Sequence, residues 1–171
     1  MKVRSIFSSL LIAAAAISGA AFFVSCTHEK VPVSTEKTEQ DRYANGEYIV
    51  KIAGCNDCHT AGYTEAAGDM PVEKWLTGSP LGWRGPWGTT YASNLRLLVA
   101  SMTEEEWVHL AHNTKWLPPM PWYVLREMKE SDLADIYYFV KALGPAGEPM
   151  PRYLPPDQDP EGPYVDFPGH P

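Results

Sequence analysis

The strongest constraint on the fold is a five-residue motif, Cys55-Asn56-Asp57-Cys58-His59. Two cysteines three positions apart can form thioether bonds to neighbouring edges of one porphyrin, and the histidine directly after them is then carried under the iron. A neutral imidazole is a good axial ligand for that iron. The motif occurs once in the 171 residues. The sequence therefore predicts one covalent haem c, attached to Cys55 and Cys58 with His59 as an axial ligand of the iron.

Two other kinds of site use closely spaced cysteines, and the sequence favours neither. A structural zinc site needs a second pair of cysteines or histidines. The third cysteine, Cys26, lies far from the motif, and the one close histidine pair is His109 and His112. A thioredoxin-like dithiol follows a strand in a βαβ unit, whereas the residues before Cys55 have a helical pattern.

The N-terminus has the pattern of a bacterial export signal that ends in a lipidation site. Two basic residues precede an uncharged apolar stretch from Ile6 to Val24, which Ser25 and Cys26 follow. We expect residues 1–25 to be a lipoprotein signal peptide and Cys26 to carry the lipid. An uncleaved transmembrane anchor and a plain cleaved signal are the alternatives. Each places the chain on the periplasmic side of a bacterial membrane, and the sequence does not decide between inner and outer membrane.

The rest of the chain divides into a tether, a domain and a tail. We expect residues 26–40 to form a flexible tether, residues 41–144 a cytochrome c domain, and residues 145–171 an irregular, acidic tail. Nine of the 16 prolines fall in that tail, which argues against a helix or strand there.

Three helices are predicted within the domain from apolar spacing and end signals. They cover residues 41–53, 104–113 and 132–143. Gly54 ends the first, and Gly144 ends the last. Thr103 and Glu106 form a capping box for the second, and Ser131 is the expected N-cap of the third.

The segment from residue 62 to 94 is rich in tryptophan, glycine and proline and shows neither helical nor strand periodicity. We expect a structured loop, because so many aromatic side chains should not be left in water. The aromatic candidates to line a haem pocket are Trp83, Trp87, Tyr91, Trp116 and Trp122. Arg84 or Arg96 is a candidate partner of a haem propionate, whose buried charge needs one.

The second axial ligand of the iron is predicted to be Met120. It lies in Pro118-Pro119-Met120-Pro121-Trp122, where the prolines stiffen an extended segment that can aim the thioether at the iron. Met70 is the rival, but it follows His59 closely and leaves a short path around the haem. A histidine or an open sixth position remains as a further alternative. Methionine with histidine raises the reduction potential relative to two histidines.

The order of these features resembles class I c-type cytochromes. Over residues 41–143 it runs helix, Cys-x-x-Cys-His-Thr, aromatic loop, capped helix, Met-Pro and final helix. Gly46 and Tyr138 resemble the glycine–aromatic helix crossing of that family. The resemblance implies an all-α fold, the class I cytochrome c fold, with helices around one covalent haem, a Trp/Gly/Pro-rich loop and an irregular Pro-rich tail.

Two segments are more similar still to the cytochrome subunits associated with bacterial alcohol and aldehyde dehydrogenases. They are residues 43–50, Tyr-Ala-Asn-Gly-Glu-Tyr-Ile-Val, and residues 54–60, Gly-Cys-Asn-Asp-Cys-His-Thr. Residues 91–95 resemble the part in which those proteins place an asparagine near a haem propionate, which implies that role for Asn94. The resemblance also implies a dehydrogenase as electron donor and a terminal oxidase or another cytochrome as acceptor.

The predicted function is the transfer of single electrons between redox proteins, with no catalysis of its own beyond a role as the electron-accepting subunit of a dehydrogenase. The net charge of −7 favours partners with basic docking patches, and no basic stripe suggests a nucleic acid partner. The alternative is a haem c enzyme, peroxidase-like or a sulfur-compound oxidase, with an open or displaceable sixth position. A haem-based sensor is a third class, which normally carries a signalling domain.

Overall fold

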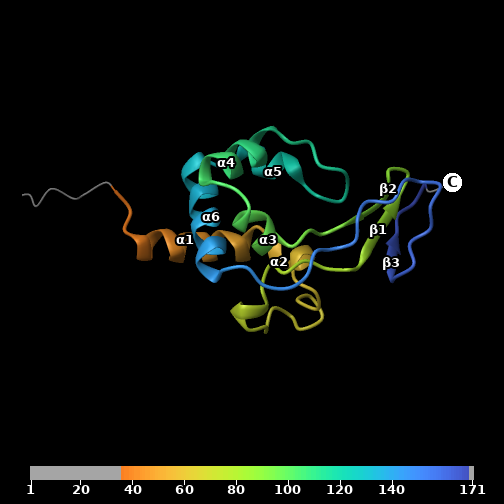
Figure 1. The fold of residues 1–171 in the computed structure, drawn as a ribbon, viewed down its shortest axis with the longest axis horizontal. Coiled ribbons are helices and arrows are strands. Elements are labelled where there is room, and N and C mark those ends of the chain that lie inside the picture. Colours follow the sequence, from red (N-terminus) through yellow and green to blue (C-terminus); the bar gives the residue numbers. More distant parts are fainter. Residues whose placement is uncertain (1–35, 170–171) are drawn as a thin grey trace, which may run out of the picture. The chain divides into compact units, whose positions relative to one another are not determined.

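The computed structural model describes residues 36–169, so the predicted signal peptide and the lipidation site at Cys26 lie outside the described residues. The elements are, in chain order, α1 (Glu39–Ile52), α2 (Cys55–His59), the 3-10 helix η1 (Val72–Lys74), β1 (Gly82–Gly85), β2 (Gly88–Tyr91), α3 (Leu95–Ala100), α4 (Glu104–Asn113), α5 (Trp122–Glu127), α6 (Glu130–Leu143) and β3 (Tyr164–Asp166) (Figure 1). No helix in this described range is long and apolar enough to cross a membrane.

The first helix, α1, confirms the predicted one and begins slightly earlier, at Glu39. A capping box explains the earlier start. The Thr38 hydroxyl accepts a hydrogen bond from the Asp41 N–H at 3.1 Å, and the Asp41 carboxylate accepts one from the Thr38 N–H at 3.1 Å. The helix ends just before Gly54, whose φ of +68° reverses the chain as predicted.

The crossing of α1 and α6 depends on Gly46, as the sequence predicted, but its aromatic partner differs. A Cβ at Gly46 would lie 2.1 Å from the carbonyl oxygen of Asp135 and 2.7 Å from the Cβ of Phe139. Phe139 is therefore the aromatic residue at the crossing. Tyr138, the predicted partner, instead stacks with the Arg42 guanidinium at 4.7 Å.

The helix α4 spans the predicted residues, and its capping box is confirmed. The Thr103 hydroxyl accepts from the Glu106 N–H at 3.2 Å, and the Glu106 carboxylate accepts from the Thr103 N–H at 2.8 Å. The last helix, α6, ends before Gly144, as predicted. Its N-cap is Lys129, which makes no side-chain cap, so the prediction of Ser131 as the N-cap is wrong.

The prediction of an all-α, class I cytochrome c fold is wrong, because the described chain also contains a three-stranded mixed sheet in the order β2-β1-β3. An antiparallel hairpin joins β1 to β2, with Gly82 opposite Tyr91 and Gly85 opposite Gly88. The hairpin lies within the residues predicted to form an irregular loop. Its strands are four residues long and begin with glycine, which leaves too little alternation for a strand to be predicted. In Figure 1 the sheet lies at the end opposite α1.

The third strand, β3, comes from the tail in which the sequence predicted neither helix nor strand. It runs parallel to β1, and Leu154 of the same tail forms a bridge with Thr89 at the other side of the hairpin. The Thr89 and Leu154 backbones exchange hydrogen bonds of 2.8 and 3.0 Å. We call residues 150–167 the C-terminal strap, since they pair with both strands of the hairpin.

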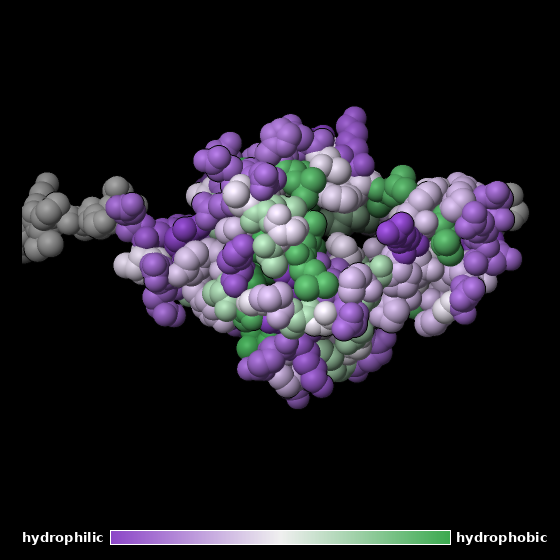
Figure 2. All heavy atoms as spheres, viewed as in Figure 1, coloured by the Kyte–Doolittle hydropathy of each residue, from purple (hydrophilic) through white to green (hydrophobic). Residues whose placement is uncertain are grey.

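The hydrophobic core lies among the helices and the loop that precedes β1. In Figure 2 hydrophobic residues show at the surface around a hollow in the middle of the face, and hydrophilic residues cover much of its periphery. The buried apolar side chains pack α1, α3, α4 and α6 together: Ile49, Val50, Trp75, Leu76, Val99, Trp107, Ala111, Leu133, Ile136, Phe139 and Val140.

Candidate functional site

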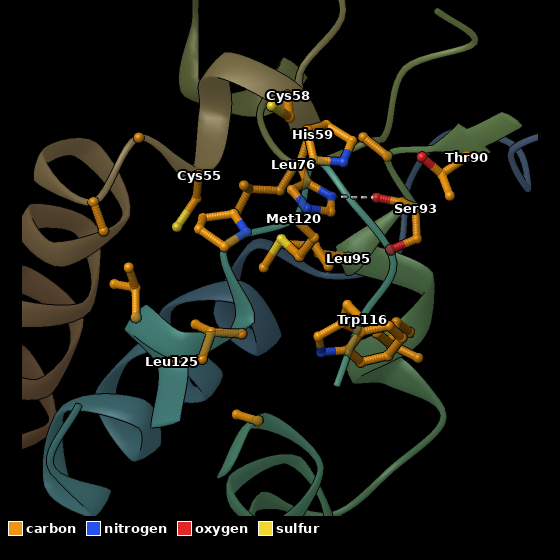
Figure 3. Close-up of a pocket in the computed structure, with 18 of the residues that line it drawn as sticks. Cys55, Cys58, His59, Leu76, Thr90, Ser93, Leu95, Trp116, Met120 and Leu125 are labelled. Atoms are coloured by element: carbon orange, nitrogen blue, oxygen red, sulfur yellow. Dashed lines mark hydrogen bonds between the residues drawn. The ribbon is translucent and has the colours of Figure 1, made fainter. Parts of the chain in front are cut away.

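One cavity of about 360 Å³ is lined by all four residues predicted to hold the haem and its iron. Cys55, Cys58, His59 and Met120 all contribute to its wall (Figure 3). Its volume falls within the roughly 300–1,000 Å³ common for cofactor and ligand pockets. The walls are mainly apolar and come from helices, hairpin and strap: Val50, Leu76, Trp83, Leu95, Leu98, Trp107, Trp116, Leu125, Pro151 and Tyr153.

The motif forms a single helical turn, α2, which presents both cysteines on one side because residues three apart on a helix are neighbours. The following residue, Thr60, fixes this turn against the loop before β1. Its hydroxyl donates to Asn56 Oδ1 at 2.7 Å and accepts from the Leu76 N–H at 2.7 Å. The motif therefore sits on a buried hydrogen-bonded support.

The imidazole of His59 is 8 % exposed, and its orientation is set by one hydrogen bond. Its Nδ1 lies 2.8 Å from the carbonyl oxygen of Ser93, drawn as a dashed line in Figure 3. A carbonyl oxygen can only accept, so Nδ1 carries the proton and Nε2 keeps its lone pair. Burial also lowers the pKa of His59, against the opposing effect of the Ser93 hydrogen bond. Burial therefore favours a neutral imidazole, and the Ser93 hydrogen bond at Nδ1 leaves its Nε2 available to bind a metal ion.

The two thiols differ in their surroundings. Burial raises the pKa of Cys55 to about 11, well above its ordinary value. Burial also raises the pKa of Cys58, and the nearby Asp57 carboxylate adds to that shift. Both cysteines are free thiols in the structure. Neither is a good nucleophile in this state, since the thiolate is the reactive form.

Among the methionines considered as the second axial ligand, Met120 lines the cavity and the rival Met70 does not. Met70 instead packs against the hydrophobic core, and its carbonyl accepts a hydrogen bond from the Trp75 indole N–H at 2.9 Å. The cavity wall also includes Met128. The carbonyl of Met128 accepts from His112 Nε2 at 3.0 Å. Met128 therefore replaces Met70 as the residue against which Met120 must be tested.

Of the aromatic residues predicted to line the pocket, Trp83, Tyr91 and Trp116 line the cavity, whereas Trp87 and Trp122 lie outside its wall. Tyr91, at the end of β2, lines the cavity. Trp87, in the hairpin turn, lies outside the cavity wall and packs against Phe167 of the C-terminal strap, with ring centroids 5.3 Å apart. Phe167 also contacts Trp83, at 6.0 Å between centroids, and Trp83 does line the cavity.

Two of the three predicted propionate partners, Arg84 and Asn94, also lie outside the cavity wall. Arg84 forms an ion pair with Asp159 of the strap. Asn94 caps α3 through its side-chain oxygen, and its amide donates to the carbonyls of Ala146 and Glu148 at 2.8 and 3.2 Å. Both side chains therefore hold the C-terminal segment against the rest of the fold.

The third predicted partner, Arg96 of α3, is buried, and its side chain caps the C-terminal end of α6. Its guanidinium donates to the carbonyls of Leu143 and Gly144, and to the carbonyl of Glu73 at 3.2 Å. A cation beside the carbonyl end of a helix is stabilising. The side chain thus links α3, α6 and η1.

Sequence reasoning missed the residues that complete the site from a distance. They are the Ser93 carbonyl, Thr90 of β2, and Pro151 and Tyr153 of the strap. A backbone carbonyl has no sequence signal of its own. The strap residues have no local sequence signal either, because their place in the cavity wall follows from strand pairing with a distant part of the chain.

The donor set in this cavity fits a covalent haem. Two thiols one helical turn apart, a neutral imidazole with a free Nε2, and a thioether are the groups that haem c attachment and axial ligation use. The apolar wall suits a porphyrin and excludes water from it. Elsewhere in residues 36–169, no three histidine, cysteine or acidic side chains form a metal-binding group.

Comparison of the chain with family models, with curated proteins and with solved structures found no match in any of the three.

Proposed function

We propose that this protein is a monohaem c-type cytochrome that carries single electrons between redox proteins. The observation that carries the proposal is the state of His59. Its Nδ1 is bound to the Ser93 carbonyl, which leaves Nε2 free in the same apolar cavity as Cys55, Cys58 and Met120.

Each residue of the site then has a defined task. Haem, when bound, supplies reversible one-electron exchange at its iron. Cys55 and Cys58 would hold it through thioether bonds, while His59 and Met120 would occupy the two axial positions. The Ser93 hydrogen bond orients the imidazole, and partners of this kind raise ligand basicity. A methionine at the second position leaves no place for a substrate, which favours a carrier over an enzyme.

The proposed location and partners rest on the sequence. The signal-like residues 1–25 and Cys26 support a lipid-anchored protein on the periplasmic side of a bacterial membrane. The resemblance of residues 43–50 and 54–60 to dehydrogenase-associated cytochromes supports a dehydrogenase as donor and a terminal oxidase or another cytochrome as acceptor.

Covalent attachment is tested by producing the protein together with a c-type haem maturation system. We expect haem to stay with the chain on a denaturing gel, because thioether bonds survive unfolding. Cys55→Ala and Cys58→Ala should each weaken that signal, and the double variant should abolish it. Haem that leaves the wild-type chain on denaturation refutes the proposal.

The carrier function is tested by the second axial ligand. Ferric haem with a methionine sulfur ligand has a weak long-wavelength absorption band, which we expect in the oxidised wild type. Met120→Leu should remove the band, and Met70→Leu, outside the cavity wall, should retain it. Loss in Met128→Leu alone would move the ligand to Met128. A wild type that lacks the band and binds cyanide readily would instead support the haem enzyme.

A further inference from the structure

The segment that presents Met120 depends on an outside hydrogen-bond donor. Pro118, Pro119 and Pro121 have no backbone N–H, so this stretch can be tied to the rest of the fold only through its carbonyls or side chains. On the C-terminal side of Met120, the Trp122 N–H bonds back to the Met120 carbonyl at 2.9 Å, where α5 begins.

On the N-terminal side, the donor is Thr90 of β2. Its hydroxyl donates to the Pro118 carbonyl at 2.8 Å, and the Trp83 carbonyl is a more distant acceptor at 3.5 Å. Within the described part of the chain, this is the one hydrogen bond that joins residues 115–119 to another element. Figure 1 shows the α4–α5 connection extending toward the strands of the hairpin.

Strand pairing on both sides holds the backbone around Thr90. Thr90 lies opposite Trp83 in the β1–β2 ladder, and both side chains line the cavity. Its neighbour Thr89 is fully buried and pairs with Leu154 of the C-terminal strap through two backbone hydrogen bonds. The hydroxyl therefore projects from a strand that is paired on both sides, toward a segment that has little support of its own.

We propose that Thr90 is a positioning residue for Met120, holding the proline-rich segment so that the thioether faces the haem position. This inference rests on the proposed function, and it concerns how the second ligand is held rather than which cofactor is bound. Thr90 acts through the Pro118 carbonyl and does not itself touch the iron. Mutation of a residue that orients a metal ligand commonly costs roughly 10- to 100-fold in metal affinity. Because Pro118 is exposed, we expect a smaller effect from the loss of its hydrogen bond to Thr90.

The test compares two adjacent threonines. Thr90→Val keeps the side-chain shape and removes the donor. Thr89→Val is the matched control, because the Thr89 hydroxyl is buried without a hydrogen-bond partner, so its loss should be neutral or stabilising. Thr90→Ser should restore the wild-type behaviour, since it returns the hydroxyl.

Two readouts are measured on the haem-loaded protein. The first is displacement of the methionine ligand by added imidazole, followed by loss of the long-wavelength band. We expect Thr90→Val to raise the apparent imidazole affinity about 5-fold, which corresponds to the ~1 kcal/mol of one hydrogen bond. The second is amide hydrogen exchange in residues 114–122, which should quicken in Thr90→Val and stay unchanged in Thr89→Val.

The outcomes separate this inference from the proposed function. A wild type without the band refutes methionine ligation itself. A wild type with the band, and imidazole affinity equal in wild type and Thr90→Val, refutes the positioning role and leaves the cytochrome proposal standing. Equal effects in Thr89→Val and Thr90→Val also refute it, because they would show a general loosening of the strand.

Discussion

Gly46 lies where α1 crosses α6, and Gly46→Ala tests whether that crossing tolerates a side chain. The added Cβ would stand 2.1 Å from the Asp135 carbonyl oxygen and 2.7 Å from the Phe139 Cβ. The first of these atoms is helix backbone and cannot rotate away. Ordinary contact begins near 3.4 Å, so the two helices must separate by more than an ångström locally.

The energy follows from three contributions. Overpacking of a tight interface costs about 1–3 kcal/mol, and a rigid backbone contact places this case at the upper end. Separation also stretches the Asn45–Asp135 hydrogen bond, which is 2.7 Å long and contributes about 1 kcal/mol. Alanine in a helix interior returns about 1 kcal/mol relative to glycine. We expect a net loss of about 3 kcal/mol in the free energy of unfolding.

The assay is urea unfolding followed by far-UV circular dichroism, in which the midpoint falls while the slope is unchanged. Ala44→Gly is the matched control, because Ala44 is an exposed residue of the same helix. That variant reports the helix-propensity contribution alone, and we expect a loss of about 1 kcal/mol. If Gly46→Ala is as stable as the wild type or more stable, propensity outweighs the steric contact and the reasoning is wrong.

Three further changes test other parts of the structure. Gly88 has a φ of +97°, and its Cβ would lie 2.2 Å from the Leu154 carbonyl; Gly88→Ala should therefore destabilise the fold by about 2–3 kcal/mol and make the C-terminal strap sensitive to limited proteolysis, and an intact strap would contradict this. Arg96→Met leaves three backbone carbonyls without their donor and should cost about 3 kcal/mol by urea unfolding, whereas Arg96→Lys should lose less. The raised pKa of Cys55 favours the protonated thiol in the folded, haem-free chain, so the free energy of unfolding should be steady below pH 9 and decline as the pH rises toward 11. Cys55→Ala should flatten that decline, and an unchanged pH profile would argue against burial of the thiol.

Helix ends with a local signal could be predicted from the sequence. The capping box of α4 lies within four consecutive residues, Gly144 directly follows α6, and Gly54 directly follows the C-cap of α1. The start of α6 could not be predicted, because Lys129 provides no side-chain cap and Ser131 offered a better local candidate. The beginning of α6 is instead held by a tertiary contact, in which the Trp107 indole N–H donates to the Leu133 carbonyl at 2.9 Å.

The sheet could not be predicted because its stability is not local. β1 contains glycine at both ends, and its outer neighbour β3 is contributed by the proline-rich tail. Prolines are compatible with this strand, since Pro163 uses only its carbonyl in the pairing, accepting from the Gly82 N–H at 2.9 Å. A short strand at a sheet edge with proline before it tolerates the missing donor. The prolines of the tail are therefore incompatible with a central strand but compatible with the short edge strand β3.

In the candidate site, too, the features with a local signal could be predicted, and those that depend on distant segments could not. The thiols and His59 lie in one helical turn, so the motif alone predicted that they would come together. The side chains predicted to meet a propionate, Arg84 and Asn94, instead bind the C-terminal segment, whose position no local pattern revealed. Tyr91 does line the cavity because the register of the hairpin places it there.

The two proposed axial ligands differ in how far their supports lie along the chain, so we expect them to respond differently to denaturant. His59 lies in the same helical turn as both cysteines, and its ring is held by Ser93, directly before Asn94 and α3. Met120 instead depends on Thr90, and through it on a hairpin held by the distant strap. Local opening draws on segments with few buried contacts and exposed hydrogen bonds, and the Thr90–Pro118 bond is exposed. Mild denaturant or loss of the strap should therefore release Met120 while His59 remains in place.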